Sequence, residues 1–352
     1  MRYLLSNRRI LLARKTTGPP LCGQRFFRHT STHPSLGFEP LGIVNYPEGD
    51  SEFEDRLTSE QWEEFDEALE LKDAGEHARA GSILRGFLSR FPFHIDTYQH
   101  LGVIEYMNNR KARAFKYFEM GYRIGMESVL QSRPKLLPWG MTDNRLFLRA
   151  AHSYALGLSE RKRYIEAIEI YELILAWNPS DNQGIRFILP SEYVEAQLPS
   201  KAKEYMDAHG ADGMNVFTRC LVEVLEGHFD EAIRWLCQGL CYNVHFPSIA
   251  TGRDKQPLQK DSYGLVLGSR EEASDYLKYN PTWNQPLTQS FLRKVLDAAP
   301  IANRIRQVIQ LHSEIASHKG ADQSTERVRL GEESFRVFDQ QSIRKIFCQV
   351  LI

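Results

Sequence analysis

The sequence predicts an all-α protein: a solenoid of antiparallel helix hairpins, with inserted helices and with capping helices at its C-terminal end. The first observation is a spacing, because Ala80 and Ala114 stand 34 residues apart and alanine recurs at equivalent points of the pattern at Ala167 and Ala232. The second is periodicity, since apolar residues between 146 and 158 recur with the period of a helix. A period of 34 residues suits a pair of helices that approach closely where small side chains let the backbones touch.

Each hairpin of this kind carries a small residue on its first helix, and an alanine and a large side chain on its second, ahead of a proline. The residues that fit the pattern are Ala80, Gly102, Ala114, Phe118, Ala155, Ala167, Tyr171, Pro179 and Ala232. Of these, Ala114, Ala167 and Ala232 are predicted to be buried between paired helices. The pattern resembles the tetratricopeptide repeat (TPR), and the resemblance implies a protein that binds its partner along a curved helical surface.

The spacings are irregular, which determines the expected organisation. Ala114 to Ala167 is 53 residues and Ala167 to Ala232 is 65, so further segments must lie between hairpins. The second helix of the second hairpin is expected over 110–121, and one long capping helix over 287–317. The predicted segments are a leader (1–38), an extended lead-in (39–57), hairpins (about 58–92, 95–126, 143–179 and 200–246), a linker with capping helices (247–317) and a flexible tail with a short terminal helix (318–352).

The leader differs in charge from the rest of the chain. Residues 1–38 contain seven Arg and Lys residues and no acidic residue, so the net charge of −1 divides into +7 for the leader and −8 for residues 39–352. An Arg-rich, acid-free, Ser/Thr-containing N-terminus is typical of a mitochondrial transit peptide. The alternative is a disordered basic tail on a cytoplasmic protein. The acidic body argues against a general nucleic-acid binder, which needs a basic surface to neutralise phosphates.

Other classes of function find no support in the sequence. No apolar run reaches the length that spans a bilayer. The motifs HExxH and GxSxG are absent, so we expect no enzyme activity and no cofactor. One spacing, Cys237-x3-Cys241-x3-His245, would place three metal-ligand types on one helical stripe. Small thiols packed inside a hairpin account for these cysteines equally well, and we predict no metal site.

Two segments carry a more specific resemblance. Pro138-Trp139-Gly140 with Asn144-Arg145-x-Phe147-Leu148-Arg149 precedes the third hairpin, and Asn178-Pro179-x-Asp181-Asn182-Gln183-Gly184-x-Arg186 follows it. Together they resemble a bacterial-type branch of TPR proteins in which such brackets enclose one hairpin. The resemblance covers roughly residues 80–296 and includes a closing element from Gly268 to Leu292. The chain departs from the branch in having Leu146 where proline is usual, and in its leader and tail. The resemblance implies the fold and assigns no activity.

The brackets supply the candidate site. Its predicted residues are Trp139, Arg145, Arg149, Asn182, Gln183 and Arg186. In one interpretation Trp139, Arg149 and Arg186 come together, and the two guanidinium groups clamp a carboxylate or an acidic peptide. In the other, Asn178, Asp181 and Asn182 cap helix ends and the arginines pair with them to lock the junction.

A second comparison concerns the groove. The chaperone-binding TPR domains hold an acidic C-terminal peptide with Lys and Asn on their first helices. The matching positions here carry Gln99, Val103, His152 and Leu156, so that clamp is absent. The sequence therefore favours a non-catalytic mitochondrial scaffold or adaptor that binds a protein or peptide segment on its concave helical surface. The alternatives are an RNA-associated helical-repeat factor of the organelle and a cytoplasmic TPR adaptor.

Overall fold

The chain is all-α apart from one short β-hairpin in the part that the structure describes. The computed structural model describes residues 36–258 and 267–317, together with residues 329, 333 and 337. The predicted leader lies almost wholly outside this range, and so does nearly all of the predicted tail. The described chain divides into two compact units, which we call the N-terminal unit (residues 36–185) and the C-terminal unit (residues from 186 onward).

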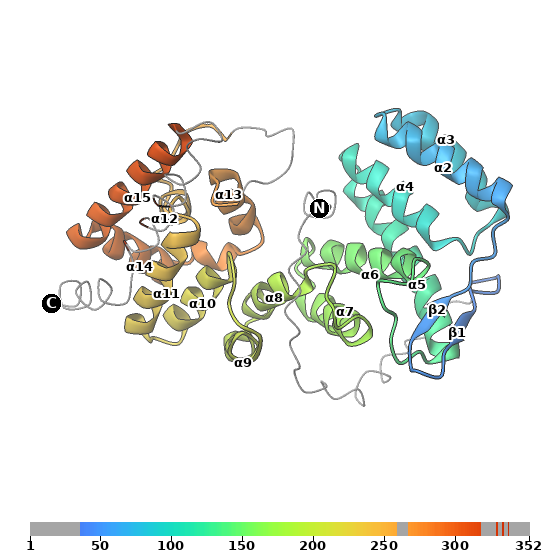
Figure 1. Ribbon diagram of the computed structural model, residues 1–352, viewed down its shortest axis with the longest axis horizontal. Helices are drawn as coiled ribbons and strands as arrows, with labels where there is room; N and C mark the ends of the chain where they lie inside the picture. The colour runs from blue at the N-terminus through green and yellow to red at the C-terminus, as the bar shows by residue number, and fades with distance from the viewer. Residues whose placement is uncertain (1–35, 259–266, 318–328, 330–332, 334–336, 338–352) are drawn as a thin grey trace. The chain divides into compact units, whose positions relative to one another are not determined.

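Three successive helix pairs form the N-terminal unit (Figure 1). In each pair the two helices pack against each other, and the second helix also contacts the first helix of the following pair. The elements are β1 (Ile43–Asn45), β2 (Ser51–Phe53), α2 (Ser59–Asp73), α3 (His77–Arg90), α4 (Ile95–Met107), α5 (Lys111–Ser132), α6 (Asn144–Ser159) and α7 (Tyr164–Trp177).

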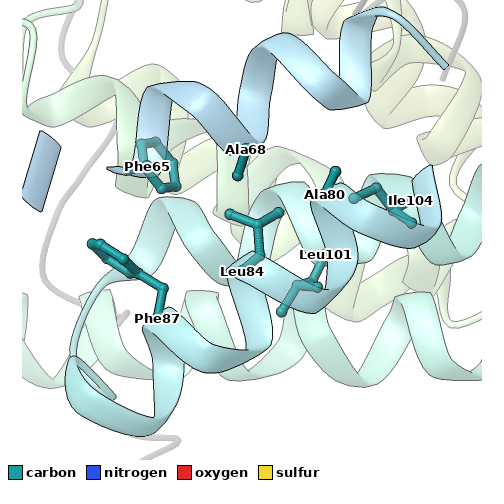
Figure 2. Close-up of a cluster of buried hydrophobic side chains, with 7 residues drawn as sticks. All are labelled: Phe65, Ala68, Ala80, Leu84, Phe87, Leu101 and Ile104. Carbon is teal, nitrogen blue, oxygen red and sulfur yellow. The ribbon is translucent and has the colours of Figure 1, made fainter. Parts of the chain in front are cut away.

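Helix α2 begins where the sequence offers a capping box. The Thr58 hydroxyl accepts a hydrogen bond from the Gln61 amide at 3.4 Å, and the Gln61 side chain accepts one from the Thr58 amide at 3.0 Å. Gly75, with φ of +84°, forms the turn into α3. Figure 2 shows the core that results, in which side chains of α2, α3 and α4 interdigitate. These residues are Phe65, Ala68, Ala80, Leu84, Phe87, Leu101 and Ile104, none more than 2% exposed.

Small residues stand where neighbouring helices approach most closely. A Cβ added at Gly102 of α4 would lie 2.3 Å from a ring carbon of Phe118 in α5. One added at Gly125 of α5 would lie 2.0 Å from the ring of Phe147 in α6. The predicted burial of the pattern alanines is confirmed, because Ala114, Ala167 and Ala232 are at most 1% exposed. The other residues of the pattern are also buried, except Pro179, which is exposed.

Two elements of this unit differ from the prediction. Helix α5 continues from 121 to Ser132 and ends at Arg133, which has φ of +49° and precedes Pro134. The prediction stopped at a glycine that ordinarily weakens a helix. Here Gly121 and Gly125 are retained inside the helix because they allow α6 to pack closely. The expected extended lead-in contains β1 and β2, which pair antiparallel.

In the C-terminal unit, α10 and α11 form a helix pair, and α9 packs against both α8 and α10. The predicted range 200–246 thus holds three helices rather than a simple hairpin. A short 3-10 turn, η2 (Ile185–Phe187), stands at the boundary between the units. The elements are α8 (Leu189–Glu195), α9 (Pro199–His209), α10 (Asn215–Leu225), α11 (Phe229–Tyr242), α12 (Phe246–Ala250), α13 (Arg270–Lys278), η3 (Pro281–Asn284), α14 (Pro286–Asp297) and α15 (Ala299–Ser317).

The single capping helix predicted over 287–317 is two helices, α14 and α15. Ala298 between them is extended, with φ of −67° and ψ of 118°. Pro300 explains the break, because its ring would clash with the carbonyl group of Leu296 and it has no N–H to donate there.

Buried polar contacts fix the segment from Gly268 to Thr288. The Tyr276 hydroxyl lies 2.9 Å from the Thr218 hydroxyl and accepts a hydrogen bond from the Trp283 indole at 3.3 Å. The Glu272 carboxylate accepts from the Gly268 amide and from Asn243. This closing element is therefore attached to α10 and to the end of α11. None of the described helices combines the length and the apolar character needed to cross a membrane.

Candidate functional site

The first bracket is attached to the end of α7 by main-chain contacts. The Leu137 amide donates to the Trp177 carbonyl at 2.8 Å, and the Trp139 amide donates to the Asn178 side chain at 3.2 Å. Arg145 donates through Nε to the Trp139 carbonyl at 2.9 Å, and its guanidinium lies 5.6 Å from the centre of the indole ring. Trp139 and Arg145 thus hold the loop in place.

Asn144 connects this loop to the β-hairpin. It is fully buried; its side-chain oxygen accepts from the Phe53 amide, and its side-chain nitrogen donates to the carbonyls of Ser51 and Pro138. The rings of Phe53 and Phe147 lie 5.4 Å apart below this contact. Several residues of the first bracket, which the sequence offered as a recognition site, therefore make contacts that hold the loop, α6 and the β-hairpin together.

The second bracket has separate roles for its residues. The Asp181 carboxylate accepts from the Ile185 amide at 2.7 Å and so closes the turn after α7. Asn182 is exposed at that turn. Gln183 is buried and donates to the Leu148 carbonyl of α6 at 2.9 Å. Arg186 belongs to the C-terminal unit, where its guanidinium stands 4.3 Å from the Phe187 ring.

Arg149 takes part in a different arrangement from the one predicted, because it pairs with Asp96 of α4 at 2.7 Å. One turn of α4 here faces one turn of α6. Gln99 donates to the Ser153 hydroxyl at 2.9 Å, and the Gln183 side-chain nitrogen also lies 3.4 Å from His152 Nδ1. These contacts form three separate pairs along α6, and we call their polar members the polar seam: Asp96, Gln99, Arg149, His152 and Gln183.

The polar seam is deeply buried except at one end. Asp96, Gln99, His152 and Gln183 are between 2% and 6% exposed, whereas the Arg149 side chain is 36% exposed. Contacts continue from Asp96 toward α2. His100 Nε2 lies 3.7 Å from the Asp96 carboxylate, and Lys72 Nζ lies 3.3 Å from His100 Nδ1. The first helices of the three pairs, α2, α4 and α6, are thereby connected through polar side chains.

Burial and charge determine the ionisation of the seam. Burial raises the pKa of Asp96, but the positive charges of Arg149 and His100 outweigh burial and leave it well below its usual value. Burial lowers the pKa of His152 to about 3, so this ring is neutral at physiological pH. The seam therefore holds one carboxylate, one guanidinium and otherwise neutral groups.

The hydrogen bonding of the seam is incomplete. Five of its buried side-chain atoms have no hydrogen-bond partner among the residues that the structure describes: Asp96 Oδ1, Gln99 Oε1, Arg149 Nε, His152 Nε2 and Gln183 Oε1. Buried polar groups in folded proteins are paired in the large majority of cases, since an unpaired one costs free energy. The seam therefore contains several buried donors and acceptors that the described contacts leave unsatisfied.

A possible metal site lies in the C-terminal unit. Ligand atoms of Glu223, Glu226 and His228 lie within 4.8 Å of one another. Lys203 Nζ already contacts the two carboxylates at 3.0 and 2.9 Å, and Arg219 donates to Glu223 at 2.9 Å. The charged groups of Lys203 and Arg219 therefore already supply the positive charge beside these carboxylates.

The cysteines at the spacing considered for metal binding have a different environment. Burial raises the pKa of the Cys237 thiol to about 12 and that of Cys241 to about 11. Both groups are therefore protonated thiols at neutral pH, as expected of small side chains packed inside a helix pair.

The sequence singled out Arg149 and Gln183 but did not connect them to α4. Gln99 and His152 entered the prediction only at the positions where a charged clamp is absent, and no prediction involved Asp96. A signal was present, because Asp96 and Gln99, like Arg149 and His152, are polar residues three apart on predicted helices. That spacing places each pair on one helix face, where a core-facing stripe would be apolar.

Comparison with protein-family models, with curated proteins and with solved structures found no match to this chain. The function of the chain is therefore inferred from its own residues and contacts.

Proposed function

We propose that this chain is a non-catalytic scaffold of the tetratricopeptide type, which binds a segment of another protein on the layer formed by α2, α4 and α6. The observation that carries the proposal is the packing of these first helices against one another, α2 against α4 and α4 against α6. In a helical-repeat solenoid, elements stacked in this way line an extended binding surface.

The close approaches inside the pairs support the same class. Gly102 and Ala155 stand at equivalent points of two first helices, and Ala114 and Ala167 at equivalent points of two second helices, all of them buried. Three members of the polar seam, Asp96, Gln99 and Arg149, make contacts between α4 and α6, on the layer that such a protein would use. The groups of the seam are suited to hydrogen bonding and include no activated nucleophile.

The location in mitochondria is part of the proposal and is supported by the composition of residues 1–38. Fusing residues 1–38 to a reporter protein is expected to direct the reporter into mitochondria. A matched leader in which the seven Arg and Lys residues are replaced by Gln should leave the reporter in the cytoplasm. Equal import of both fusions would contradict the assigned location.

The binding surface can be tested by site-specific photocrosslinking. Peptides are first selected from a phage-displayed library of random linear peptides on the full chain. A photoreactive residue is then placed at Val103 of α4 or at Leu156 of α6, both of which are half-buried on first helices. The selected peptides should crosslink at these positions and not at Lys116, an exposed residue of the second helix α5. Crosslinking at Lys116 alone, or the absence of any selected peptide, would overturn the proposed function.

A further inference from the structure

The turns that connect the helices of the second and third pairs are both basic. One lies between α4 and α5 and the other between α6 and α7, and three Arg or Lys residues stand in or beside each turn. We call this set the basic edge: Arg110, Lys111, Arg113, Arg161, Lys162 and Arg163. Residues 105–113 and 160–166 hold these six cations against three Glu residues, a net charge of +3 within a body of net charge −8.

The stacking of the two pairs brings the two turns together. Arg161 Nη2 donates to the Lys111 carbonyl at 3.3 Å, and Lys111 Nζ lies 3.2 Å from the Glu160 carboxylate. The Tyr106 hydroxyl donates to the same carboxylate at 2.6 Å. The end of α4 and the start of α5 are therefore held against the turn between α6 and α7, so the cations of both turns lie along one edge of the N-terminal unit.

The protein neutralises only part of this positive charge. The ion pairs of the basic edge are Arg110–Glu105, Lys111–Glu160 and Arg163–Glu166. Arg113 and Lys162 are exposed, and their side chains have no hydrogen-bond or ion-pair partner among the described residues. Two charges at the basic edge are therefore available to a partner without breaking a contact of the fold.

An exposed apolar side chain accompanies the cations at each turn. Met107, the last residue of α4, is 52% exposed, and Ile165, near the start of α7, is 51% exposed. No other large apolar side chain in the described N-terminal unit is as exposed as these two. A partner at the basic edge can therefore combine charge contacts with apolar contacts.

The corresponding turns elsewhere in the chain are not basic. Residues 73–76, at the turn of the first pair, include Asp73 and Glu76 and no Arg or Lys. The turn between α10 and α11 holds Glu226, Gly227 and His228. Positive charge is thus not a general property of these turns, and it is concentrated at two turns that contact each other.

We propose that the basic edge binds an acidic segment of a partner protein, in which Asp or Glu residues alternate with apolar residues. Carboxylates of that segment pair with Arg113 and Lys162, and its apolar side chains cover Met107 and Ile165. Turns and the starts of second helices form this surface. It is therefore a second binding surface, in addition to the layer formed by α2, α4 and α6.

A single-stranded nucleic acid is less suited to the basic edge. Proteins that bind such strands combine cations with aromatic rings on which the bases stack. Two rings beside the basic edge already have a cation over one face. Lys111 Nζ lies 5.1 Å from the centre of the Tyr106 ring, and the Arg161 guanidinium lies 3.7 Å from that of Phe115. The exposed apolar side chains beside the cations, Met107 and Ile165, are aliphatic and suit a protein segment.

Fluorescence anisotropy on the full chain tests the proposal with a labelled peptide of repeated Glu-Leu-Glu triplets. The same peptide with Gln in place of Glu should bind about tenfold more weakly, because it brings no negative charge to the edge. Raising the ionic strength from about 0.05 M to about 0.3 M should weaken binding of the Glu peptide, since exposed charges are screened by salt. Equal Kd values for the Glu and Gln peptides would overturn the proposal.

A protein variant locates the effect. Arg113→Glu combined with Lys162→Glu should weaken binding of the Glu peptide by about tenfold or more. The matched control is Arg85→Glu with Lys294→Glu, which reverses two exposed cations on α3 and α14 and changes the total charge equally. The control should keep most of the affinity. Equal losses in the two variants would show a response to total charge alone and would overturn the assignment to this edge.

A labelled oligouridylate tests the other class of ligand. If it binds more tightly than the Glu peptide and loses affinity in the Arg113→Glu, Lys162→Glu variant, the basic edge belongs to a nucleic acid and the acidic-segment proposal is wrong. The comparison of Glu and Gln peptides needs no variant, so it remains decisive if the charge-reversed protein fails to fold. The crosslinking test at Val103 and Leu156 can fail by itself, because those positions lie on the first helices and not at the basic edge.

Discussion

Two buried carboxylates in this chain have opposite surroundings. Glu223 of α10 is 2% exposed; Arg219 donates to one of its oxygens, while Lys203 and His228 contact the other. Asp96 of α4 is 5% exposed, but one of its oxygens has no partner among the described residues. The other four residues of the polar seam each have one such atom as well.

The difference separates a structural cluster from a site. Where both oxygens of a buried acid have partners within the protein, the cluster serves the fold. Where several buried donors and acceptors have no partner among the described residues, the fold holds groups that its own contacts do not satisfy. Substitutions in the two regions should therefore have different effects on stability and on binding.

The largest expected effect is at Glu223. Replacing it by Ala leaves the cations of Arg219 and Lys203 without their buried partner, and should lower the free energy of unfolding by about 3–5 kcal/mol. Urea denaturation followed by circular dichroism measures this loss. The control is Glu231→Ala, which removes an exposed ion pair with Arg234 and should cost about 0–1 kcal/mol. Similar losses in the two variants would contradict the structural role of Glu223.

A smaller loss is expected at Arg149. Arg149→Ala removes the main positive partner of Asp96, and should cost about 1–3 kcal/mol because His100 remains beside the carboxylate. Adding Asp96→Asn should recover much of the loss, since the unpaired charge is then gone. If adding Asp96→Asn lowers the free energy of unfolding further, the unpaired charge of Asp96 is not the cause of the loss in Arg149→Ala. The same denaturation experiment applies to both variants.

The apolar contacts of the helix pairs give a third test. Ala167→Leu inserts a larger side chain where α6 and α7 are in close contact, and should cost about 1–3 kcal/mol by overpacking. Ala78→Leu, at an exposed position of α3, is the matched control and should be nearly neutral. Equal thermal unfolding midpoints for the two variants would show that the repeat register is misplaced.

The sequence contained enough information for the helix pairs but not for their exceptions. The alanine spacing predicted the helix pairs, and the first hairpin was expected from about residue 58, where α2 begins. The continuation of α5 through Gly121 and Gly125 depends on what α6 places opposite them, which no local signal shows. The break at Ala298 could have been predicted from Pro300.

The candidate site was predicted in part for the same reason. Arg149 and Gln183 stood out because they belong to unusual polar segments. Asp96, the partner of Arg149, lies 53 residues earlier, and only the packing of α4 against α6 brings the two together. Trp139 and Arg145 were expected at a binding site, yet they hold a loop, because a polar or aromatic residue in a loop serves either purpose.

A fourth prediction concerns pH and the neutral ring of His152. Its pKa is lowered to about 3 in the folded protein, against an ordinary value near 6.5, so the unfolded chain binds more protons between these values. The free energy of unfolding is therefore highest above pH 6.5 and decreases as the pH falls from 6.5 toward 3. From pH 7 to pH 6 the loss due to His152 is about 0.7 kcal/mol.

The variant His152→Gln should show a correspondingly smaller decrease in unfolding free energy over that interval. His209→Gln, at an exposed position of α9, is the control and should keep the decrease of the unaltered protein. An unchanged slope in His152→Gln would mean that the ring is not held neutral in the folded state.

The most direct measurement combines stability and binding in one variant of the polar seam. Gln99→Leu with Ser153→Ala removes both partners of a buried hydrogen bond together with the unpaired Gln99 oxygen. Such a replacement should leave the free energy of unfolding unchanged or slightly increased. The same variant should bind the peptides selected on the full chain more weakly, because Gln99 and Ser153 join α4 to α6 on the proposed binding layer. A loss of several kcal/mol with peptide binding intact would show that these residues serve the fold, as the Glu223 cluster does, and would contradict the proposed binding layer.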